Sequence, residues 1–184
     1  MSDTLIVNRD GFPLSLLPIS AVTWQECIRL IMLDKVFMLK EYDDWVVRSP
    51  SVSMAVPSVV MTKDYVKWNR AVKFSRNHIF LRDRYTCQLC GVVPALSDLT
   101  LDHVVPKSMG GKKTWENIIT SCKRCNELKG NNPKVVPKKM PVKPSYYQLI
   151  AERQRYPIKI NDPYWQTYLG WPEDLVKLTH RRKA

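Results

Sequence analysis

Two Cys-x-x-Cys pairs form the clearest metal-binding pattern in the sequence. Four of the five cysteines belong to them, at Cys87/Cys90 and Cys122/Cys125. The first residues lack the basic start and apolar stretch of an export signal, which makes disulfides the poorer explanation. Two pairs at this spacing instead match a tetrahedral zinc site with four thiolate ligands. The sequence therefore predicts a structural zinc ion, with the segment 91–121 inserted between the two halves of its site.

An aspartate and a histidine stand side by side within that inserted segment. Asp102 and His103 interrupt an apolar run that ends with Pro106 and the pair Gly110-Gly111. Burying polar groups without partners is costly, so the pair is either satisfied in the core or reserved for chemistry. An imidazole with a pKa of about 6.5 accepts a proton from water around neutral pH. A carboxylate suits a hard cation such as Mg²⁺ or Mn²⁺, so the pair is a candidate catalytic site.

A small set of elements must position these side chains. Apolar patterning and turn residues predict a strand, a loop, a return strand and a short helix, over residues 99–106, 107–114, 115–122 and 122–130. Neighbouring residues on a strand point to opposite faces. Asp102 and His103 therefore act on one reacting group only if the strand bends or ends near them, which Pro106 and the glycine loop permit.

Taken together, these motifs resemble the HNH nuclease family. The resemblance rests on "CQLCG", "LDHVVPKSMGG", "WENIITSC" and "CKRCNELKGN", and it covers about residues 74–132. Further upstream, "LIVNRDGFPLSLLP" followed by a helix and "VRSPS" is similar to the leader of stand-alone bacterial and phage HNH proteins. The resemblance implies an α+β fold in which a ββα-metal HNH finger is stapled by the four-cysteine zinc site.

The resemblance also implies roles for single residues. His103 is the first histidine of the motif and the general base, and Asn117 is the middle residue, expected to orient the finger through backbone hydrogen bonds. Asn126 stands at the third position, which is often histidine, so this is the H-N-N variant. Asp102 and Asn126 would bind the catalytic Mg²⁺ or Mn²⁺, and the four cysteines the structural zinc. The implied reaction is hydrolysis of DNA phosphodiester bonds.

The excess positive charge lies in the part of the chain that follows residue 69. The sequence carries a net charge of +12, distributed as −1 over residues 1–69, +6 over 70–130 and +7 over 131–184. A basic region attached to a neutral one is the electrostatic footprint of a protein that binds a polyanion. Around a phosphodiester site we expect basic side chains to contact the backbone, namely Lys107, Lys112, Lys113, Lys123, Arg124 and Lys129.

Composition divides the chain into three predicted parts. Residues 1–69 indicate a small α/β N-terminal unit, 70–132 the HNH domain with its zinc site, and 133–184 a basic extension rich in proline and aromatic residues. The first part predicts strands, a helix capped by Thr23 and a hairpin turning at Asp43-Asp44; the strands are expected over 4–8, 13–17 and 57–66.

The C-terminal extension begins with a proline-rich stretch. Its prolines remove backbone donors and fix φ, so residues 131–144 are expected to form an extended basic arm. A short helix is expected within 145–156, and we expect the aromatic residues beyond it to pack on the body of the protein.

Two classes of function remain open on this pattern. The first is a metal-dependent DNA endonuclease, and the alternative is a non-catalytic zinc-containing module that binds nucleic acid. A single finger holds one active site, so cutting both strands needs a homodimer or two successive nicks. No apolar run approaches the roughly 18–20 residues of a membrane span. We therefore expect a cytoplasmic protein whose partner is DNA, with no membrane.

Overall fold

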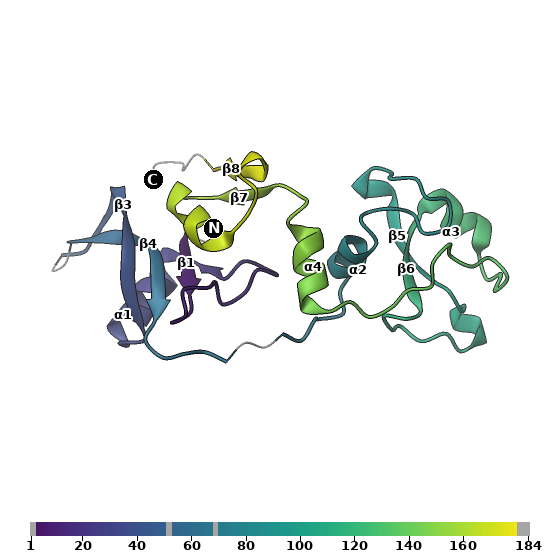
Figure 1. Cartoon of the computed structure of the whole chain (residues 1–184), viewed down its shortest axis with the longest axis horizontal. Coiled ribbons are helices and arrows are strands. Elements are labelled where there is room, and N and C mark those ends of the chain that lie inside the picture. Colours follow the sequence, from purple (N-terminus) through teal and green to yellow (C-terminus); the bar gives the residue numbers. More distant parts are fainter. Residues whose placement is uncertain (1–2, 51–52, 68–69, 180–184) are drawn as a thin grey trace. The chain divides into compact units, whose positions relative to one another are not determined.

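The computed structural model describes residues 3–50, 53–67 and 70–179. The chain divides into two compact units, traced by the colours of Figure 1. The first comprises the described residues of Met1–Asn69 together with those of Gln154–Ala184, and the second is Arg70–Arg153. The residues of the C-terminal extension are thus distributed over both units, with 133–153 in the second.

A four-stranded sheet in the order β2-β1-β4-β3 forms the centre of the first unit (Figure 1). Its strands are β1 (Thr4–Val7), β2 (Ala21–Val22), β3 (Val36–Arg48) and β4 (Ser53–Thr62). Strand β1 pairs in parallel with β4 and antiparallel with β2, while β3 and β4 are antiparallel. The predicted helix is present as α1 (Trp24–Met32), and its Thr23 cap accepts a hydrogen bond from the Glu26 amide at 3.3 Å.

Two details of this unit differ from the sequence predictions. The hairpin expected at Asp43-Asp44 is wrong, because β3 runs through both aspartates and pairs with β4 instead. Register shifts between Glu41 and Val46 absorb the extra residues as an irregularity within the strand. The strand expected over 13–17 is also wrong. Only isolated bridges form there, since Pro13 cannot donate to a ladder.

The C-terminal residues complete the core of the first unit. The elements are β7 (Ile158–Ile160), which pairs in parallel with β8 (Val176–Leu178), the helix α5 (Gln166–Leu169), and the 3₁₀ turns η3 (Pro163–Trp165) and η4 (Glu173–Leu175). Trp165 and Trp171 lie in one buried cluster with Leu5, Val7 and Val59. The expectation that the terminal aromatic residues pack on the body is therefore confirmed.

The second unit contains the predicted finger. Its elements are α2 (Arg76–Arg82), η1 (Leu96–Asp98), β5 (Leu99–His103), η2 (Lys107–Met109), β6 (Ile118–Cys122), α3 (Lys123–Lys129) and α4 (Tyr146–Arg153). Strands β5 and β6 form an antiparallel hairpin in which Asp102 pairs with Ile119, and β6 continues directly into α3. The ββα order confirms the α+β fold predicted from the motifs. The arm that precedes α4, residues 131–145, contains no helix or strand, as its prolines predict.

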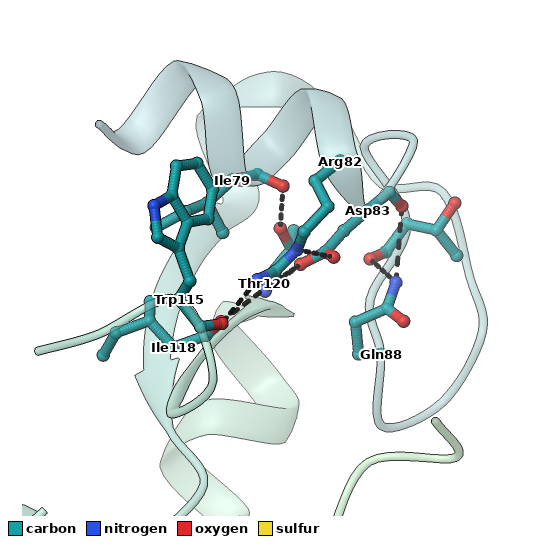
Figure 2. A network of polar contacts seen from close by, with 8 residues as sticks. Ile79, Arg82, Asp83, Gln88, Trp115, Ile118 and Thr120 are labelled. Atoms are coloured by element: carbon teal, nitrogen blue, oxygen red, sulfur yellow. Dashed lines mark hydrogen bonds and ion pairs between the residues drawn. The ribbon is translucent and has the colours of Figure 1, made fainter. Parts of the chain in front are cut away.

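Helix α2 is fastened to the return strand by a buried polar network (Figure 2). The Arg82 guanidinium donates to the carbonyls of Trp115 and Ile118, each at 2.7 Å. Asp83 pairs with Arg82 at 2.8 Å and accepts a hydrogen bond from the Thr120 amide at 2.8 Å. Both charged side chains are about nine-tenths buried, so these bonds fix α2 against β6. None of the helices in the described part of the chain is long and apolar enough to cross a membrane.

Candidate metal and active site

The four predicted zinc ligands converge in the second unit. Cys87 and Cys90 lie in the turns after α2, while Cys122 caps α3 and Cys125 lies in its first turn. Their sulfur atoms all lie within 4.8 Å of one another. In a tetrahedral zinc site, Zn–S bonds of about 2.3 Å separate the sulfurs by about 3.8 Å. The four cysteines therefore fit a zinc ion and form a site for a metal ion.

The pKa values of the clustered thiols are also consistent with a cation site. Burial raises the pKa of Cys87, but amides of Cys90, Cys122 and Leu89 outweigh it by donating to the sulfur, and the pKa falls to about 6. Burial, aided by the neighbouring thiols, raises the pKa of Cys125 to about 12. Four thiols crowded together cannot all ionise alone, because each thiolate repels the next. A bound divalent cation would remove that repulsion.

Backbone bonds bring the two halves of the cluster together. The Gln88 amide donates to the Thr120 carbonyl of β6 at 2.9 Å, and the Gly91 amide closes the turn on Cys87 at 2.8 Å. On the outside, the Lys138 amide donates to the Gln88 carbonyl at 3.1 Å. The Lys138 ammonium also donates to the Cys90 carbonyl at 3.4 Å. The sequence motifs did not reveal this contact, because Lys138 belongs to the arm that follows the finger.

The catalytic candidates lie at the end of β5. Thr100 and Asp102 contact α3, through Asn126 and Lys129, whereas Leu101 packs with the apolar core on the other side. His103 is the last residue of the strand. Within the described residues, Asp102 Oδ2 and His103 Nε2 are buried without a hydrogen-bond partner. Neither atom is hydrogen-bonded, although Asp102 Oδ2 lies beside the Lys129 ammonium.

Lys129 lies in a different environment from the one predicted. It is 3% exposed, and its ammonium lies 3.1 Å from Asp102 Oδ2 and donates to Oδ1 at 3.3 Å. The approach to Oδ2 has the distance of an ion pair but not hydrogen-bond geometry, which is why that oxygen also counts as unpartnered. The phosphate contact predicted for Lys129 needs correction, because a buried ammonium bound to Asp102 does not face solvent.

The two asparagines of the motif have different surroundings. Asn126 donates from Nδ2 to Thr100 Oγ1 at 3.0 Å, which leaves its Oδ1 as the atom that could bind a cation. Asn117 accepts from the Val105 amide at 2.8 Å and donates to the carbonyls of Lys112 and Val105, at 2.9 and 3.2 Å. Asn117 therefore holds together the loop between β5 and β6.

The surroundings of His103 lower the pKa of its imidazole. Burial lowers its pKa, and the charge of Lys107, with smaller contributions from Lys129 and Lys113, acts in the same direction. Asp102 opposes this shift, but the net effect is a pKa below the ordinary value. A neutral imidazole is the form that accepts a proton.

The remaining predicted phosphate contacts are on the surface of the finger. Their side chains are exposed, and they are Lys107, Lys112, Lys113, Lys123 and Arg124. Lys123 also forms an exposed ion pair with Asp98 at 3.2 Å. Exposed ammonium and guanidinium groups of this kind are available to a phosphate backbone.

Comparisons with known proteins agree with this site. Residues 4–72 match the family described as HNH endonuclease-associated, N-terminal domain, and residues 87–135 match the HNH endonuclease family. A CRISPR-associated endonuclease Cas9 of Corynebacterium diphtheriae is 40% identical over 53 residues. That match covers 28% of this chain and 5% of the relative's own length. No solved structure matches the chain.

The ββα order and the four-cysteine cluster thus define a domain of the metal-finger class. Residues 87–135 match the HNH endonuclease family, as the motifs predicted, and residues 4–72 match the N-terminal domain associated with such enzymes.

Proposed function

We propose that this protein is a metal-dependent endonuclease that hydrolyses DNA phosphodiester bonds. The observation that carries the proposal concerns two buried atoms on adjacent residues. Asp102 Oδ2 and His103 Nε2 have no hydrogen-bond partner, and Oδ2 has only the Lys129 ammonium beside it at 3.1 Å. Buried polar atoms are nearly always hydrogen-bonded, and exceptions call for an explanation. Two such exceptions side by side in an HNH finger are explained if Asp102 binds a cation and His103 Nε2 binds the reacting water during the reaction.

Asp102 and Asn126 are the proposed ligands of Mg²⁺ or Mn²⁺. A carboxylate and an amide oxygen are hard ligands that suit these cations, and two protein ligands leave most coordination positions to water and phosphate. When bound, the cation supplies stabilisation of the negative charge that develops on the phosphate and the leaving oxygen. The thiolate cluster is chemically distinct and is proposed to hold zinc.

His103 acts as the general base. Its Nε2 takes a proton from a water molecule, whose oxygen then bonds to phosphorus as the bond from phosphorus to the 3′ oxygen breaks. The leaving oxygen takes up a proton from solvent, which yields a 3′-hydroxyl and a 5′-phosphate. Asn117 contributes indirectly, because its hydrogen bonds shape the loop that follows His103.

Plasmid cleavage tests the proposal. Zinc-loaded protein should nick or linearise supercoiled plasmid when Mg²⁺ or Mn²⁺ is added, and His103→Ala should lose at least about 100-fold in rate while it still binds DNA. His78→Ala is a matched control, since this imidazole lies on α2 and its Nδ1 is already bonded to the Lys73 carbonyl at 2.8 Å. The control should cleave at nearly the wild-type rate.

The alternative function predicts the opposite result. A non-catalytic zinc-containing module would bind nucleic acid without cutting DNA or RNA under any divalent cation, and His103→Ala would change nothing. The products also decide the mode of cleavage. Nicked circles indicate one site acting alone, whereas linear product whose rate rises with the square of protein concentration indicates a homodimer.

A further inference from the structure

The ammonium of Lys129 is a buried charge that the proposed reaction does not use. It contacts both oxygens of Asp102, at 3.1 and 3.3 Å, and donates to the His103 carbonyl at 2.6 Å. The lysine is 3% exposed and the aspartate 7%. The Lys129 side chain therefore contacts both Asp102, the proposed metal ligand, and His103, the proposed general base.

Lys129 also completes the attachment of α3 to β5. The helix begins at the cysteine cluster, and one turn later Asn126 donates to Thr100. Lys129 follows three residues after Asn126 on the same face and is the last residue of the helix. The cysteines thus fix the start of α3, while Lys129 fixes its end to the end of β5.

We propose that Lys129 is a positioning residue, the built-in counterion of Asp102. It holds the carboxylate and the last peptide of β5 in place before any divalent cation arrives, and it then shares that carboxylate with the cation. The counterion role follows from the contacts of the chain itself. The sharing with a cation rests on the proposed function.

Thermal unfolding of the zinc-loaded protein tests the counterion role without any cleavage assay. Breaking a buried pair leaves one charge uncompensated, so Lys129→Met and Asp102→Asn should each lower the melting temperature by roughly 10–20 °C. The double variant buries neither charge and should melt above both single variants. A double variant that loses the sum of the two single losses would overturn the proposal.

A matched control is available on the same helix. Lys123 forms an ion pair with Asp98, but these side chains are 57% and 52% exposed. Lys123→Met and Asp98→Asn should shift the melting temperature by only about 1–3 °C, and their double variant should show little coupling. Equal coupling in both pairs would contradict a special role for the buried pair.

Mn²⁺ binding, measured by titration calorimetry, tests the shared carboxylate. Without the competing ammonium, Lys129→Met should bind Mn²⁺ at least about tenfold more tightly than the wild type. Unchanged or weaker binding would refute the sharing, provided that zinc content stays at one ion per chain. Both measurements are independent of cleavage. If the protein cuts no DNA but gives the expected melting temperatures and Mn²⁺ affinities, the counterion role of Lys129 stands and only the proposed function is refuted.

Discussion

At the scale of single residues, two adjacent glycines face different constraints. Gly110 has a φ of +83° and open space where a Cβ would lie. A Cβ on Gly111 would lie 1.8 Å from the Val105 carbonyl oxygen, a distance that no rotation of a side chain relieves. This is the loop that Asn117 holds together after His103, so the backbone itself packs closely beside the site.

Replacing these glycines should therefore have unequal effects. Gly111→Ala should destabilise the second unit by about 3 kcal/mol or more, because the backbone must move. Gly110→Ala should lower stability by only about 1–2 kcal/mol, the free-energy cost of placing alanine in the left-handed conformation. Urea unfolding of the two variants would measure the difference, and equal losses would contradict the close contact at Gly111.

At the scale of elements, the finger depends on α2 as well as on zinc. The Arg82 guanidinium donates to the carbonyls of Trp115, before β6, and of Ile118, its first residue. It also pairs with Asp83, which accepts from the Thr120 amide. This network was missed by sequence reasoning, because adjacent Arg and Asp residues are common on surfaces. Only the packing of α2 on the hairpin shows that both are buried.

Arg82→Met should cost about 3–5 kcal/mol of stability, since it leaves the buried Asp83 carboxylate without its cation. Arg84→Met serves as the control. Arg84 is exposed and its ion pair with Glu152 is worth about 1 kcal/mol or less. Denaturant titration would compare the two, and similar losses would show that the Figure 2 network adds little.

Zinc removal should act on the second unit alone. Cys87→Ser, or a strong chelator, deletes a link between the turn after α2 and the start of α3, and structural zinc sites contribute folding free energy directly. Hydrogen exchange should show lost protection over residues 70–153 and unchanged protection over the N-terminal sheet. Full protection and full activity without zinc would contradict the predicted metal.

At the scale of the whole molecule, the first unit is built from both ends of the chain. Trp165 is 3% exposed, and its indole Nε1 donates to the carbonyl and the hydroxyl of Ser58, each at 3.0 Å. The sequence division ended the N-terminal part at residue 69, where charge and composition change. The whole second unit, Arg70–Arg153, separates this part along the chain from its C-terminal partners. Contacts this distant in sequence produce no local pattern.

Trp165→Ala should therefore unfold the first unit selectively. Loss of a buried tryptophan costs about 3–5 kcal/mol, and two hydrogen bonds are lost with it. Zinc content and exchange protection of residues 70–153 should stay at wild-type levels. Loss of zinc in this variant would show that the second unit depends on the first for its fold.

The sequence alone predicted the class of domain and its candidate site. The two cysteine pairs, Asp102-His103 and the spacing to Asn117 and Asn126 identified the finger, because metal ligands and a general base need particular residue types at particular positions. The order of strands and helix around them followed from local turn residues and hydrophobic periodicity. These are properties of neighbouring residues, so they can be read along the chain.

Only the tertiary structure decided which charges are buried and what they bind. Lys129 was predicted to contact a phosphate backbone, yet it lies buried against Asp102 because α3 packs on β5. Arg82 and Lys138 acquired their partners in the same way, through contacts between distant segments. The physical reason is that burial depends on packing of whole elements, whereas residue type and spacing specify only what each element is able to do.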